Sequence, residues 1–277
     1  MNAIEFSALI GAASMLAGFL GALTGLGGGV VIVPLLALVF KVDIHYAIGA
    51  SLVSVIATSS GAAAAYVREG FSNIRVGMFL EIATTAGAIV GAFLATSTPT
   101  HALAIVFGAV LLFSAAASWR KKIDNPHAEP NKLAALLKLD GSYPAAGKKQ
   151  SYTVQRVPLG FGLMFGAGTL SGLLGIGSGA VKVLAMDEAM SIPFKVSTTT
   201  SNFMIGVTAA ASAGIYLSRG YIHPALDFPV TLGVLIGSLI GARFLVRART
   251  KVVRIVFALV IATLGFEMIF NGITGRL

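Results

Sequence analysis

The chain has 277 residues, of which 56% are hydrophobic and only 11% charged, and its mean hydropathy is +0.87. A water-soluble domain cannot bury so large an apolar fraction, so this composition excludes a soluble protein and indicates an integral membrane protein. The formal net charge is +9, but the basic residues cluster in loops beside apolar segments, which indicates topology determinants and not a nucleic-acid-binding surface. The absence of cysteine excludes disulfides and thiolate chemistry.

The apolar segments, taken in chain order, predict two kinds of membrane element. The N-terminus lacks a basic region and is interpreted as the first membrane segment, not as a cleaved signal peptide. A spanning helix needs about 20 mostly apolar residues. Six segments satisfy this: 46–67, 75–97, 101–118, 196–217, 225–246 and 252–270. Two others, 8–40 and 158–186, are too long for one helix, and each is cut by a glycine cluster. We expect a helical hairpin or discontinuous helix at each, re-entrant or fully crossing, with its break facing inward.

The two glycine clusters belong to an internal duplication. Gly25-Leu-Gly-Gly-Gly29 returns 150 residues later as Gly175-Ile-Gly-Ser-Gly179. The same offset, without gaps, matches further positions: Ser51 with Ser201, Thr58 with Thr208, Tyr66 with Tyr216 and Gly87 with Gly237. Repeats of this kind are typical of secondary transporters, which bind substrate in the bilayer where the repeats meet.

Each repeat is expected to cross the membrane an odd number of times, so the two halves should be inverted relative to one another. The inverted arrangement places several basic sites on one side: Arg68, Arg75, the run 120–122 and the cluster 247–251. The positive-inside rule makes that side cytoplasmic. A parallel duplication would instead separate the last two clusters, against the rule.

The predicted fold is therefore an all-α membrane protein of two inverted-topology repeats, each with a glycine-broken helical hairpin plus three transmembrane helices. The first repeat spans 1–118 and the second 158–277. The polar and basic segment 119–157 is expected to be a cytoplasmic linker, with a short amphipathic helix at 131–138 and a small strand at 151–155. We expect the protein to be a multi-pass protein of the cell (inner) membrane.

The helix breaks predict an anion site. A helix that begins inside the membrane presents unpaired N–H groups and the positive end of its dipole to the break. The second copy adds Lys182, where the first has Ile32. A lysine near the bilayer centre costs on the order of 2.5–3.5 kcal/mol, so it requires a counter-charge, a wet cavity or a bound anion. Snorkelling to the interface is an equally weighted alternative.

Small polar residues open the helix that follows each break, at matched depth in the two halves. The candidate substrate-binding residues are Gly27, Gly28, Gly29, Ser51, Gly177, Ser178, Gly179, Lys182, Thr200, Ser201 and Asn202. For single glycines, close helix packing is the competing interpretation, and for most of the hydroxyls it is back-bonding to the helix. Because Asn202 replaces Leu52 and Ser178 replaces Gly28, the pocket should be asymmetric.

Glu81 is the candidate for proton coupling among ionisable residues inside the spans, with an ion pair to Arg75 as the slightly favoured alternative. The sequence contains no zinc motif, no nucleophile elbow and no P-loop lysine. We therefore expect neither an enzyme nor a cofactor or metal site.

Several stretches resemble the TauE/SafE family of membrane transporters, named for sulfite export. They are Gly21-Ala-Leu-Thr-Gly-Leu-Gly-Gly-Gly-Val-Val-Ile-Val-Pro34, Ala47-Ile-Gly-Ala-Ser-Leu52, Ser171-Gly-Leu-Leu-Gly-Ile-Gly-Ser-Gly179, Leu139-Asp-Gly-Ser-Tyr143 and Tyr152-Thr-Val. The resemblance covers nearly the whole chain and implies a duplicated multi-pass protein that moves sulfite, sulfonates or related anions. One departure is that Ser178 and Leu184 stand where the family pattern usually has a third glycine and a proline.

The leading hypothesis is a secondary transporter of small sulfur-containing anions that works by alternating access, with export implied by the resemblance. A passive anion channel, import of a sulfonate or carboxylate, and a receptor or assembly subunit are the alternatives. The expected partners are a small anionic substrate and the lipid bilayer, with no nucleic acid. A homodimer is left open.

Overall fold

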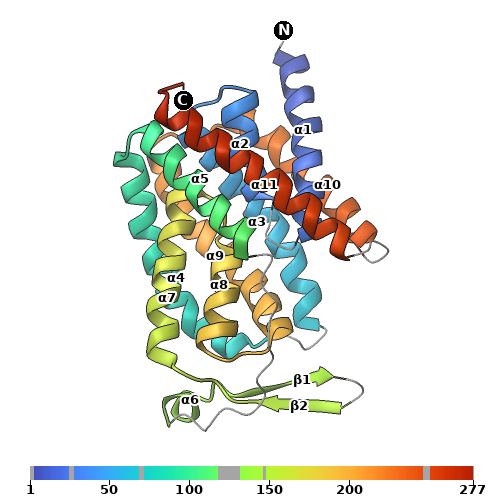
Figure 1. Ribbon diagram of the computed structural model, residues 1–277, viewed down its shortest axis with the longest axis vertical. Coiled ribbons are helices and arrows are strands. Elements are labelled where there is room, and N and C mark those ends of the chain that lie inside the picture. The colour runs from blue at the N-terminus through green and yellow to red at the C-terminus, as the bar shows by residue number, and fades with distance from the viewer. Residues whose placement is uncertain are drawn as a thin grey trace.

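The protein is described by a computed structural model that covers residues 3–24, 28–68, 72–117, 132–145, 148–245 and 250–276. Long helices dominate it (Figure 1). The first half contains α1 (Ala3–Thr24), α2 (Gly29–Pro34), α3 (Ile44–Arg68), α4 (Ile74–Ser97) and α5 (Thr100–Ala117). The second half contains α7 (Val157–Leu174), α8 (Gly179–Leu184), α9 (Phe194–Ser218), α10 (Pro224–Leu245) and α11 (Thr250–Ile273). The six uninterrupted spans predicted from the sequence match α3, α4, α5, α9, α10 and α11, with ends within three residues.

The element bounds repeat at the same offset as the sequence. Helices α2 and α8 begin and end 150 residues apart, and so do α3 and α9. Each short helix continues into a π-helical turn, η1 (Leu35–Val39) after α2 and η2 (Ala185–Ala189) after α8. Pro34 precedes the first turn and Leu184 the second, so proline is not what causes the π geometry.

The two halves pack through reciprocal helix pairs. Helix α1 packs against α10, and its counterpart α7 packs against α4, while α3 meets α9 and α5 meets α11. Glycines allow the close approach: a Cβ at Gly18 would run into the Val234 carbonyl, and one at the matched Gly168 would run into the Thr84 carbonyl. Small residues at such crossings let helix backbones approach, which drives association where no hydrophobic effect operates.

Helices α5 and α11 run antiparallel. A Cβ built on Gly265 would lie 3.1 Å from the Gly108 carbonyl oxygen, and one on Gly272 would lie 2.9 Å from that of His101. Higher residue numbers in α11 therefore meet lower numbers in α5. Because these two helices occupy equivalent places in the two halves, their opposed directions bear on how the halves are related.

The outer surface of the bundle is apolar. Three helices in the described residues, 74–97, 157–174 and 224–241, are long and apolar enough by length and composition to cross a membrane, and several shorter apolar helices accompany them. Large hydrophobic side chains on several helices are more than half exposed, among them Leu16, Met78, Leu239 and Phe266. In water such a surface would aggregate, whereas lipid covers it without cost.

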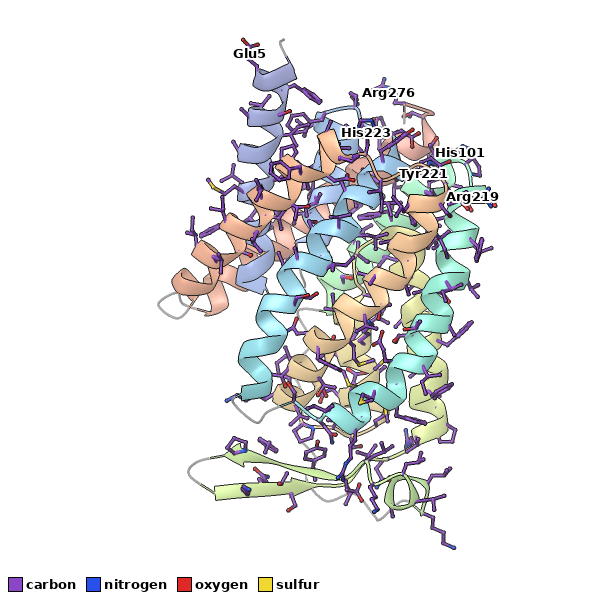
Figure 2. The ribbon with its side chains drawn as sticks, turned by 180° about the vertical axis from the view of Figure 1, so that it is seen from behind. Glu5, His101, Arg219, Tyr221, His223 and Arg276 are labelled. Atoms are coloured by element: carbon purple, nitrogen blue, oxygen red, sulfur yellow. The ribbon has the colours of Figure 1, made fainter. Side chains whose placement is uncertain are left out.

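A small polar module covers one end of the bundle. It contains α6 (Lys132–Leu136) and an antiparallel hairpin of β1 (Gly141–Ala145) and β2 (Lys148–Tyr152). The predicted short helix at 131–138 is present as α6. The strand predicted at 151–155 lies three residues earlier, as β2, because it pairs with β1, a strand that was not predicted. The chain ends lie at the opposite end of the molecule (Figure 1), where Figure 2 shows Glu5, His101, Arg219, His223 and Arg276.

Asn73 fastens this module to the bundle. Its side-chain oxygen caps α4 by accepting from the Val76 N–H. Its amide nitrogen donates to the Leu139 carbonyl at 2.9 Å and to the Tyr152 hydroxyl at 2.7 Å. Burial raises the pKa of the Tyr152 phenol above its usual range, so the hydroxyl stays protonated.

Candidate functional site

The second glycine cluster breaks the helix as predicted. Helix α7 ends at Leu174, and three of the next four residues adopt left-handed backbone conformations, Gly175 at φ +67°, Gly177 at φ +68° and Ser178 at φ +45°. Glycine adopts such angles without steric cost, whereas Ser178 is strained there. Helix α8 then begins at Gly179. In the first copy, α1 ends at Thr24 and Gly28 precedes α2, while Gly27 lies outside the described residues.

The two breaks lie side by side in the interior. A Cβ on Gly29 would lie 2.6 Å from the Ser51 hydroxyl oxygen and 2.9 Å from the Gly175 carbonyl oxygen. The Ser51 hydroxyl donates to that same Gly175 carbonyl at 2.7 Å, and the Ser201 hydroxyl donates to the Gly179 carbonyl at 3.3 Å. Two matched serines therefore brace the backbone at the junction of the halves.

Lys182 is completely buried and connects to Glu81 through one hydroxyl. Its Nζ donates to Thr208 Oγ1 at 2.6 Å, and Thr208 Oγ1 donates to Glu81 Oε1 at 2.7 Å. We call these three residues the Lys182 network. They come from α8, α9 and α4, so both halves of the chain contribute. A buried ion pair is tolerated only when its members neutralise one another and are hydrogen-bonded.

The surroundings of Glu81 leave one of its oxygens free. Oε1 also accepts from the Thr85 hydroxyl at 3.1 Å. Oε2 is buried and has no hydrogen-bond partner among the described residues. Within that part of the chain no ion pair joins Glu81 to Arg75, so the alternative of an Arg75 ion pair is not what this conformation contains. The burial of Lys182 likewise disagrees with snorkelling, and Glu81 is the acidic residue that it reaches through Thr208.

The remaining predicted site residues take different places. The Thr200 hydroxyl accepts from the Asn73 N–H at 3.0 Å, at the start of α4 and away from the Lys182 network. Asn202 is half-buried. Ser178 lies one turn before Lys182, with its hydroxyl buried and without a partner in the described residues. Gly28, Gly29, Gly177 and Gly179 all border the two breaks.

Thr208 is the member of the network that sequence reasoning did not select as a ligand. A helical threonine usually bonds back to its own helix, and Thr208 can also do so, because the Met204 carbonyl lies 2.9 Å away. A usable signal was its position seven residues after Ser201, which places both on one face of α9.

One groove elsewhere in the protein lacks comparable chemistry. It lies between α4, α6 and α7, has a volume of about 360 Å³, and is lined only by apolar side chains: Phe79, Leu133, Leu137, Val157, Pro158 and Phe161. Such a lining offers no group that binds an anion.

A buried lysine and glutamate joined by a hydroxyl, next to a glycine-broken helix in a bundle with an apolar surface, are typical of membrane transport proteins. Comparison with known proteins agrees. A family model described as "Sulfite exporter TauE/SafE" matches residues 10–268, and the chain belongs to this family.

Curated relatives cover nearly its whole length. The "Probable membrane transporter protein YunE" of Bacillus subtilis (strain 168) is 27% identical over 94% of this chain and 96% of its own. "YdhB" from the same organism is 28% identical over 82% of this chain and 84% of its own. "ORF9" of a Sinorhizobium species is 21% identical over 96% of this chain and 94% of its own. No solved structure matches. The protein is thus a multi-pass membrane transporter of the TauE/SafE family.

Proposed function

We propose that the protein is a secondary transporter of small sulfur-containing anions, such as sulfite or organosulfonates, that works by alternating access with export as its direction. The observation that carries this proposal is the buried side chain of Lys182 next to the second break, which Thr208 holds and connects to Glu81. An ammonium and a hydroxyl are suitable donors for an anionic oxygen. The family's description supplies the sulfur chemistry.

We infer that the two repeats have inverted topology in the membrane. The antiparallel packing of α5 against its counterpart α11 supports this, because a parallel duplication would give these helices the same direction. The reciprocal pairs α1 with α10 and α7 with α4 fit a pseudo-two-fold axis in the membrane plane. Such symmetry provides two alternative packings of one scaffold, which is what alternating access requires.

The polar module is proposed to face the cytoplasm of the cell (inner) membrane. The segment 119–157 contains eight basic and three acidic residues. Basic residues in short segments near membrane helices are retained on the cytoplasmic side. The domain division into repeats at 1–118 and 158–277, separated by this linker, follows from the same assignment.

A carrier is favoured over a passive channel because Lys182 is sealed from solvent, whereas an open pore would leave its selective cation accessible. Besides Lys182, the side chains of Ser51, Ser178, Ser201 and Asn202 are proposed to orient the substrate. Thr200 is proposed to contribute only after a rearrangement of α9 against α4.

Flux in proteoliposomes tests this function. Purified protein would be assayed with sulfite, an organosulfonate, sulfate, acetate and chloride, with and without a pH gradient. Saturable flux and counterflow of the sulfur-containing anions are expected, and Lys182→Met should abolish them while the exposed control Lys132→Met should not. Flux that does not saturate would favour a channel, and no flux of any anion would favour a receptor or assembly subunit.

A further inference from the structure

We propose that Glu81 takes the place of the substrate at Lys182 while the site is empty, so that a monoanion binds in exchange for protonation of Glu81. This inference rests on the proposed transport of anions. It adds that one proton moves with each anion and that the substrate has a single negative charge.

The Glu81 carboxylate and an anionic substrate would use the same donors. Glu81 Oε1 is held by the Thr208 hydroxyl at 2.7 Å, which itself accepts from Lys182 Nζ at 2.6 Å. A sulfonate or carboxylate oxygen of a substrate would accept from the same hydroxyl and the same ammonium. The single positive charge of Lys182 balances only one of the two anions in a buried site, so the two anions compete for it.

Thr208 has an alternative acceptor within reach. Its hydroxyl has a single proton, which it gives either to Glu81 Oε1 at 2.7 Å or to the Met204 carbonyl at 2.9 Å. Thr208 therefore keeps an acceptor for its proton in the interval between the release of Glu81 and the arrival of a substrate oxygen. The threonine acts as a switch between two arrangements that are both hydrogen-bonded.

The second carboxylate oxygen of Glu81 is where a proton would bind. Glu81 Oε2 is buried and has no hydrogen-bond partner among the described residues. One proton from the aqueous phase binds the carboxylate, which becomes a neutral acid and leaves Thr208. Lys182 keeps its charge of +1, and the incoming anion supplies the −1 that Glu81 has lost.

Charge neutrality then restricts the states that can change conformation. The groups that face Glu81 are Lys182 from α8 and the hydroxyls of Thr208, Thr84 and Thr85, while α7 has no titratable residue. With Lys182 at +1, the site has no net charge when Glu81 is ionised and no substrate is bound. It also has no net charge when Glu81 is protonated and a monoanion is bound. Protonated Glu81 without an anion, or ionised Glu81 with one, leaves a buried net charge, which is strongly disfavoured.

Two consequences follow for transport. Proton and anion move in the same direction, one for one, so export requires an outward anion gradient that exceeds the inward proton gradient. A dianion such as sulfate would leave a net charge of −1 beside protonated Glu81. The site therefore selects monoanions: hydrogen sulfite, organosulfonates and carboxylates of similar size.

The test uses methanesulfonate as probe, because it is a monoanion at every usable pH and any pH dependence then belongs to the protein. In proteoliposomes, wild-type protein should accumulate it at least tenfold when the outside is made acidic, with one proton entering per anion and no response to a valinomycin-imposed potential. Sulfate should not compete. Glu81→Gln should keep counterflow but lose this accumulation, and Thr231→Val, at the position matched to Glu81, should behave like wild type.

Separate results overturn the separate claims. Gradient-driven accumulation by Glu81→Gln, or equal competition by sulfate, would overturn the inference and leave the proposed transport standing. Flux in the wild-type protein that is driven by membrane potential would do the same without relying on a variant that has to fold. Wild-type protein that moves no sulfite or sulfonate at all would overturn the proposed function, and the inference with it.

Discussion

A short helix follows each of the two breaks at matched positions, but among the described residues only the second break has a charged side chain beside it. Lys182, Thr208 and Glu81 form the network beside the second break, and the positions matched to them in the other half are Ile32, Thr58 and Thr231. Ile32 is fully buried among apolar side chains, and Thr58 bonds back to the Ser54 carbonyl at 3.0 Å. Duplication thus supplied a symmetric scaffold, and the charged chemistry was added on one side of it.

The backbone conformation also differs between the two breaks at one matched position. Ser178 is left-handed at φ +45°, whereas the matched Gly28 is right-handed at φ −64°. Ser178, the residue with the strained backbone, lies next to the charged network, one turn before Lys182. Local strain of this kind persists only where the surrounding structure holds it.

The largest effect in this comparison should come from removing the lysine. Lys182→Met leaves Glu81 as an uncompensated buried charge, so we expect a loss of about 3–5 kcal/mol in the free energy of unfolding together with loss of flux. The double variant Glu81→Gln/Lys182→Met should recover the stability but not the flux. Denaturant unfolding in mixed micelles measures the first quantity and proteoliposome flux the second. Equal stability of the two variants would contradict the charge pairing.

Copying the network into the first half should come next. Ile32→Lys introduces an unpaired ammonium and should destabilise the protein by about 2.5–3.5 kcal/mol. Adding Thr231→Glu supplies the matched counter-charge, and Thr58 already provides the bridging hydroxyl, so the double variant should regain most of that loss. A double-mutant cycle on unfolding free energy measures the coupling, and simple additivity of the two changes would show that the halves are not equivalent scaffolds.

Removal of the bridging hydroxyl should have an intermediate effect. Thr208→Val takes away the hydroxyl that bridges the two charged groups, and we expect a loss of about 1.5–3 kcal/mol, the value of a hydrogen bond to a charged group. Thr58→Val, its matched control, removes only back-bonding to α3 and should cost well under half as much. Thermal unfolding of the two purified variants provides the comparison, and similar losses would argue against the network.

The smallest effect should separate the two bracing serines. Ser51→Ala removes a 2.7 Å bond between the halves and should cost about 1 kcal/mol, while Ser201→Ala removes a longer 3.3 Å bond and should cost less. Unfolding free energies decide the order, and a larger loss at Ser201 would reverse our ranking.

Much of the fold could be predicted from the sequence, because glycine clusters, apolar segment lengths and the 150-residue offset are local signals. The site was harder. Glu81 and Lys182 were each selected, but their pairing joins residues a hundred positions apart, which no periodicity reveals. Elimination offered one route, since buried charges inside a membrane must pair and few were available. Thr208 and the contact between Thr200 and Asn73 depend on how α9 packs against α4, which the sequence does not specify.

The most direct test of the account is sulfite counterflow by the charge-neutral double variant Glu81→Gln/Lys182→Met, after its folding has been verified. The account predicts that wild-type protein shows saturable counterflow and that this folded variant shows none, because the ammonium that holds the anion is gone. Saturable counterflow retained by the folded double variant would contradict the assignment of Lys182 to the substrate site.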